Sequence, residues 1–114
     1  MDESKLMDLD TIKYLRATLE DDINALFNTF ITETPSSIEN LARAINQQNI
    51  LNTYNTAHLL KGSGGNIGAS AFANACNILE QQSENNALIQ PEIQVANIRQ
   101  LFKETVTYMN NNMS

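Results

Sequence analysis

Residues 57–69 read AHLLKGSGGNIGA, and this stretch holds all four glycines of the 114-residue chain. A glycine inside a helix costs about 1 kcal/mol relative to alanine, because it loses more conformational freedom on folding. A helix through Gly62, Gly64 and Gly65 therefore gives up stability within a single turn. We expect the missing side chains to serve a close contact or access to a neighbouring group.

The stretch lies in a predicted helix that begins near Ile50 and ends near Gly65 or Ile67. At roughly 100° per residue, mostly apolar and small residues gather on one side of this helix, which we take as its core face. That face consists of Ile50, Thr53, Ala57, Leu60, Gly64 and Ile67. His58 lies off it, on a half-polar and partly bare surface. This surface consists of Leu51, Tyr54, Asn55, His58, Lys61, Gly62 and Gly65. A partner can approach the imidazole over the two bare glycines.

The rest of the chain also has the helical period of apolar residues, and no segment alternates long enough to predict a strand. Predicted helices begin at Asp10 (as N-cap), near Asp21, at Thr34-Pro35, at Ser70 (as cap) and at Pro91. The helix from Asp21 ends near Glu33. Short connections favour antiparallel neighbours. We predict an all-α fold, namely an up-down antiparallel four-helix bundle with one or two additional short N-terminal helices. It forms one domain over 1–114, with an N-terminal extension at 1–9 and a frayed tail at 110–114.

The predicted core contains the helix faces that carry Phe27, Phe30, Phe72, Phe102 and the methionines. The single cysteine, Cys76, lies in an apolar stripe, which is typical of a buried and unreactive thiol.

Charge and composition exclude several classes of function. The net charge of −6 leaves no basic field for nucleic acid or anionic lipid. One cysteine and one histidine are too few ligands for a zinc site, so we expect no metal and no cofactor. The chain has no apolar run of membrane-spanning length and no signal-peptide pattern, which predicts a cytoplasmic protein.

His58 has the chemistry of a phosphoryl acceptor. A neutral imidazole nitrogen is a good nucleophile toward an acyl phosphate, and an exposed imidazole is mostly neutral near pH 7. Lys61 follows one helical turn later and can place a mobile ammonium group beside the phosphoryl oxygens.

The pattern Ala57-His58-x-apolar-Lys61-Gly62, followed by small residues and Gly68-Ala69, resembles the signature of the histidine-containing phosphotransfer (HPt) domain family of bacterial multistep phosphorelays. The resemblance covers roughly residues 10 to 109. It includes the helix at Asp10, the junction from Phe30 to Pro35, the stripe at Leu41 and Ile45, and Leu79-Glu80.

The resemblance implies that His58 is phosphorylated on its outward ring nitrogen, and that Lys61 and Gly62 accommodate the phosphoryl group. It implies a monomeric carrier without its own ATP-dependent kinase site. The implied partners are receiver domains of response regulators and/or a hybrid sensor histidine kinase, with Mg²⁺ held by the receiver. Some family members orient the imidazole with a glutamine on the next helix. Glu80 stands at that position here, with Gln81 beside it, so this role is open.

Proteins of other functional classes compete with this interpretation. A histidine kinase needs a nucleotide-binding domain and a hydrolase or metal enzyme needs more catalytic groups than one histidine, so both are disfavoured. The serious rival is a bundle that binds a partner without transferring phosphate. Leu51, Tyr54 and Leu59 belong either to packing or to a docking rim, together with Asn55 and Gly65. Gly62 either provides clearance or ends the helix.

Overall fold

The computed structural model describes residues 3–113, and every regular element in that range is a helix. The helices are α1 (Glu3–Leu6), α2 (Leu9–Leu19), α3 (Asp22–Asn46), α4 (Ile50–Asn66), α5 (Ser70–Glu84) and α6 (Pro91–Asn112). The prediction of an all-helical chain is confirmed.

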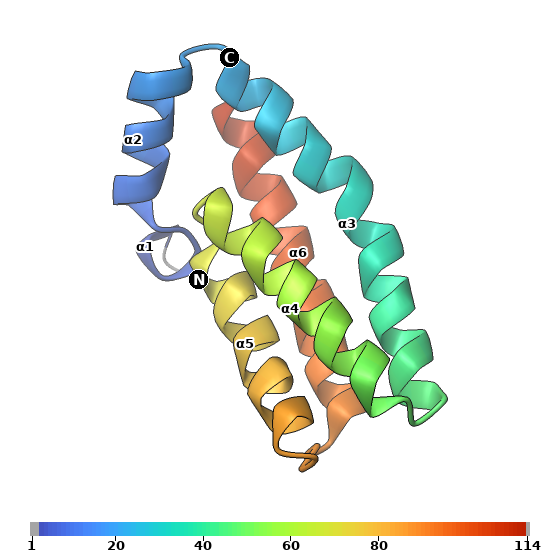
Figure 1. The fold of residues 1–114 in the computed structure, drawn as a ribbon. Helices are drawn as coiled ribbons and strands as arrows, with labels where there is room; N and C mark the ends of the chain where they lie inside the picture. The colour runs from blue at the N-terminus through green and yellow to red at the C-terminus, as the bar shows by residue number, and fades with distance from the viewer. Residues whose placement is uncertain (1–2, 114) are drawn as a thin grey trace.

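Four long helices surround a common core. Helix α3 packs against α4 and α6, and α5 packs against the same two helices. Consecutive long helices run in opposite directions (Figure 1). Helices α4 and α5 lie side by side on one face of the molecule. The short helix α2 lies beside one end of the four long helices and connects to the start of α3.

Helix α4 continues through all three glycines of its last turns, as predicted. Its core face is buried at Thr53, Ala57, Leu60 and Gly64. A Cβ atom added to Gly64 would lie 2.7 Å from Phe72 Cδ1, which is well inside contact distance. Glycine at this position therefore lets α4 and α5 approach each other closely, which places the outer flank of α4 beside α5.

An aromatic cluster joins the other three long helices beneath α4. Phe30 of α3 meets Phe72 of α5 edge to face, with ring centroids 5.5 Å apart and an interplanar angle of 86°. The Phe30 ring also lies 5.5 Å from the ring of Phe102 of α6. Edge-to-face pairs at such distances are favourable beyond their buried area. Cys76 of α5 is fully buried, as predicted. Burial raises the pKa of its thiol to about 12, which disfavours the reactive thiolate.

Helix α3 corrects the prediction of two helices separated at Thr34-Pro35. It runs unbroken for 25 residues with Pro35 inside it. Proline lacks the amide proton that the Ile31 carbonyl would accept, which weakens a helix locally. However, Phe30, Thr34 and Ile38 are all buried on one face of α3, on both sides of the proline. Packing of this continuous face outweighs the lost hydrogen bond.

The N-terminal segment also differs from its prediction. Asp8, not Asp10, caps α2: its Oδ1 accepts hydrogen bonds from the amides of Asp10 (3.2 Å) and Thr11 (3.3 Å). Residues 3–9 were expected to be an extension, yet they include α1, and Leu6 and Met7 are buried in the core. Residues 1 and 2 lie outside the described range.

Two further boundaries differ. Ser70 is the first residue of α5 rather than its cap, and its hydroxyl faces the Leu6 carbonyl at 3.4 Å. The expected frayed tail at 110–114 is helical through Asn112, whose carbonyl accepts a hydrogen bond from Arg16 at 2.9 Å. Residue 114 lies outside the described range. These contacts are made between segments far apart in the sequence, which local patterns do not encode.

Candidate functional site

His58 lies on the flank of α4 that faces α5, and its side chain is 60% exposed. The α4 periodicity explains this position, because the core face of the helix passes through Ala57 and Leu60 on either side of the histidine. The imidazole is therefore attached to a rigid helix while its ring reaches the surface.

Glu80 of α5 contacts the His58 ring. Its Oε1 pairs with Nδ1 of His58, although the two residues are 22 positions apart in the sequence. Its second oxygen, Oε2, lies 2.5 Å from Nζ of Lys61. The Glu80 side chain is only 6% exposed, so one buried carboxylate holds two cationic or proton-donating groups at the surface.

The charge state of Glu80 follows from these contacts. Burial acts to raise the pKa of its carboxyl, but the hydrogen bonds and charges of Lys61 and His58 outweigh burial and lower the pKa. The carboxylate is therefore ionised near pH 7 and can only accept a hydrogen bond. Nδ1 of His58 must then carry the proton, which leaves the lone pair of the neutral ring on Nε2.

The surface beside His58 is bare where the sequence predicted it to be. A Cβ atom added to Gly62 or to Gly65 would meet no atom within 4 Å. Both glycines are in the helix, so Gly62 does not end it. Open space of this kind leaves room for a phosphoryl group or for the backbone of a partner.

Apolar side chains flank the bare strip. Leu51 is 65% exposed and Leu59 is 57% exposed, so neither belongs to the core. Tyr54 is half-buried, and its ring lies nearly parallel to that of His58 with centroids 6.0 Å apart. Asn55 is exposed on the same flank. Leu59 also lines a shallow cavity between α3 and α4.

The structure thus brings His58, Lys61 and Glu80 together, and it separates Gln81 from them. Gln81 is exposed, and in the described part of the chain the ring nitrogen Nδ1 pairs with Glu80, so Glu80 is the better placed of the two to orient the imidazole. The sequence alone leaves open whether Glu80 orients the imidazole. One feature of the sequence points to a role for Glu80, because it stands beside the apolar stripe of Phe72, Cys76 and Leu79. A glutamate at such a buried position is expected to be paired.

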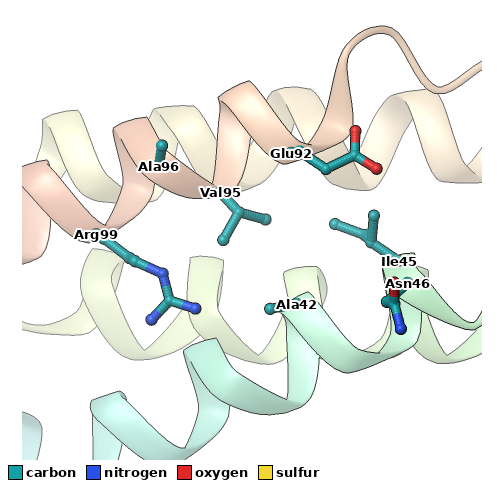
Figure 2. Close-up of a pocket in the computed structure, with 7 residues that line it drawn as sticks. All are labelled: Ala42, Ile45, Asn46, Glu92, Val95, Ala96 and Arg99. Carbon is teal, nitrogen blue, oxygen red and sulfur yellow. The ribbon is translucent and has the colours of Figure 1, made fainter.

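A separate cavity lies between α3 and α6, away from the α4 and α5 seam. Figure 2 shows Val95 and Arg99 of α6 pointing toward Ala42 and Ile45 of α3 across this cavity. The volume of the cavity is about 270 Å³. None of the residues lining it is a histidine, cysteine or serine.

The described residues contain no cluster of three or more histidine, cysteine or acidic side chains that could hold a metal ion. Within the same range, none of the helices has the length and apolar character needed to cross a membrane.

Comparisons with known proteins agree with this geometry. The model of the Hpt domain family matches residues 25–109, which is more than half of the chain. A crystal structure of histidine-containing phosphotransfer protein B (HptB) from Pseudomonas aeruginosa PAO1 has a similar fold. It has a TM-score of 0.90 and 21% sequence identity, over 95% of this chain and 94% of that one. No curated protein sequence matches the chain.

Proposed function

Because this chain belongs to the Hpt domain family, and so acts in histidine phosphotransfer within phosphorelay signalling, we propose that His58 is the residue that carries the phosphoryl group. His58 is the single histidine of the chain. The observation that supports it best is the pairing of Nδ1 with the buried Glu80 carboxylate on an exposed ring. This pairing leaves Nε2 as the nucleophile.

The transfer step follows from these groups. Nε2 attacks the phosphorus of an aspartyl phosphate on a receiver domain, so that an Nε2–P bond forms. The P–O bond of the mixed anhydride breaks, and the partner's aspartate leaves as a carboxylate. The Nδ1 proton stays on the ring, held by Glu80. Lys61 supplies positive charge beside the phosphoryl oxygens, and Gly62 leaves the space that they occupy.

The surface around His58 is suited to docking of a receiver domain. Leu51 and Leu59 of α4 offer exposed apolar area before and after His58 along the chain, and Tyr54 and Asn55 lie between Leu51 and His58. Gly65 extends the bare strip. Exposed apolar side chains grouped around a reactive residue are typical of an interaction site.

Further parts of the proposal rest on the family and on composition. We classify the four long helices as an up-down antiparallel four-helix bundle and the whole of 1–114 as one domain. The protein is a cytoplasmic, monomeric carrier without an ATP-dependent kinase site of its own. Its partners are receiver domains of response regulators and/or a hybrid sensor histidine kinase, and the receiver supplies Mg²⁺. The acidic net charge of −6 argues against nucleic acid as a partner.

The test uses two phosphoryl donors on wild type and His58→Gln. The first is phosphoramidate, which needs no protein partner, and the second is a receiver domain labelled on its aspartate. We expect acid-labile, base-stable label on the wild type only. A bundle that binds partners without transfer would acquire no label from either donor. Label on His58→Gln would place the acceptor elsewhere.

A further inference from the structure

The Glu80 carboxylate should affect His58 after the ring has been phosphorylated as well as before. It is buried, it contacts the His58 ring nitrogen that is not phosphorylated, and it is paired with Lys61. We propose that Glu80 keeps the Nδ1 proton on the ring after the phosphoryl group has been added. Phosphorylated His58 can therefore still release its phosphoryl group when the pH is alkaline. This inference rests on the proposed function, because it requires Nε2 of His58 to be the acceptor.

The Nδ1 proton decides how readily the phosphoryl group leaves. Release breaks the Nε2–P bond and leaves the bonding electron pair on Nε2, while a new P–O bond forms to a carboxylate or to water. If water is the acceptor, its proton passes to the medium. With Nδ1 protonated, the ring departs as neutral imidazole. Without that proton it departs as imidazolate, which is a much stronger base and a much poorer leaving group.

A carboxylate favours only one of these two ring states. Ionised Glu80 has no proton to donate, so it can accept from Nδ1–H but cannot bond to a deprotonated Nδ1. Loss of the ring proton would set a nitrogen lone pair against an oxygen of the buried Glu80 carboxylate. An amide side chain differs, because it can accept through its oxygen or donate through its nitrogen, and so can bond to either state.

The neighbouring charges support this assignment. On α4, the ring faces Tyr54 and lies one turn from Lys61, and on α5 it faces Glu80. Lys61 helps to keep Glu80 ionised, because its ammonium group lies 2.5 Å from Oε2. As a positive charge, Lys61 alone would favour loss of the ring proton, so Glu80 is the group of this set that retains it.

The experiment follows the phosphorylated ring over a range of pH. Wild type, Glu80→Gln and Lys61→Met are phosphorylated with phosphoramidate, and the donor is removed. The rate of phosphoryl loss to water is then measured from about pH 5 to about pH 10, together with the ¹⁵N resonance of Nδ1 in protein labelled with ¹⁵N-histidine. Free phosphohistidine in the same buffers is the reference.

We expect the ring of the wild type to lose its Nδ1 proton at least about one pH unit above Glu80→Gln and above free phosphohistidine. At pH values above both midpoints, the wild type should release phosphate at least about tenfold faster than Glu80→Gln, because the rate follows the fraction of rings that are protonated at Nδ1. Lys61→Met removes a positive charge but keeps the carboxylate, so its midpoint should equal or exceed that of the wild type.

The inference is overturned if the wild type and Glu80→Gln titrate together, or if Lys61→Met shifts in the same direction as Glu80→Gln. A merely structural role for Glu80 would change thermal stability without moving the midpoint. If Glu80→Gln does not fold, the comparison of wild type with free phosphohistidine decides alone. Failure of the proposed function is distinct, because wild type would then take up no phosphoryl group, or His58→Gln would take it up too.

Discussion

At the scale of single residues, the glycines of α4 serve two different purposes. Gly64 faces Phe72 of α5 and has no room for a side chain, whereas Gly62 and Gly65 face open space. The first therefore serves packing, and the other two keep the surface beside His58 bare. Residues of the same type within one turn are distinguished only by what lies opposite them.

Alanine substitutions at Gly62 and Gly64 should change the free energy of unfolding in opposite directions. Gly62→Ala removes the helical cost of glycine without a clash, so we expect it to raise the free energy of unfolding by about 0.5–1 kcal/mol. Gly64→Ala should lower it by about 1–3 kcal/mol, because the added methyl group overlaps a buried ring. Urea denaturation of both variants measures the difference. Equal changes of the same sign would contradict this account.

A larger side chain at the open position should act on transfer instead of stability. We expect Gly62→Leu to remain folded, since this position faces open space. Phosphorylation by phosphoramidate should fall less than transfer from a receiver domain, since phosphoramidate is the smaller donor. Transfer from a receiver domain should fall at least about tenfold, because the side chain occupies the surface on which the partner docks. Undiminished transfer from the receiver would remove Gly62 from the docking surface.

At the scale of one element, α3 shows how packing overrides a local signal. Pro35 is exposed, while Thr34 and Ile38 beside it are buried. The apolar face that spans the proline keeps the helix continuous, although proline is the least favourable residue in a helix interior. The helix therefore contains a local weakness that its tertiary contacts compensate.

Replacing this proline should stabilise the protein. Pro35→Ala restores an amide that can bond to the Ile31 carbonyl, while the unfolded chain gains some conformational freedom. The net expectation is an increase of about 1–2 kcal/mol in the free energy of unfolding. Ser36→Ala, also exposed, is the neighbouring control and should change it by about 0.5 kcal/mol or less. A loss of stability in Pro35→Ala would show that α3 depends on the proline ring.

At the scale of the whole molecule, the N-terminal segment closes one side of the core. Helix α1 packs against α5 and α6, and Met7 after it is fully buried. The amide of Asp8 also donates a hydrogen bond to the Gly68 carbonyl at 2.7 Å, at the turn that follows α4. The segment therefore ties the turn between α4 and α5 to the rest of the molecule.

Truncating this contact should be costly. Met7→Ala leaves a cavity among packed helices, and we expect it to lower the free energy of unfolding by about 2–5 kcal/mol. Leu9→Ala, two residues later and exposed, should lower it by less than about 1 kcal/mol. Thermal and urea unfolding measure both. Similar small effects would show that 3–9 is an extension after all.

Much of the site was predictable because it lies on one helix. His58, Lys61, Gly62 and Gly65 share a flank of α4, and the helical period alone places them off the core face. Glu80 was not predictable with the same force. Its approach to His58 depends on how closely α5 packs against α4, and that distance is set by Gly64 and Phe72 across the interface.

The amino-acid order alone determined an all-helical chain with an exposed, lysine-flanked histidine, because both follow from interactions within a few residues of one another. Only the folded molecule decided that α3 would pass through Pro35, that Met7 would be buried, and that the Glu80 carboxylate would hold the His58 ring. These outcomes depend on contacts between distant segments, whose energies outweigh local preferences only once the helices have packed.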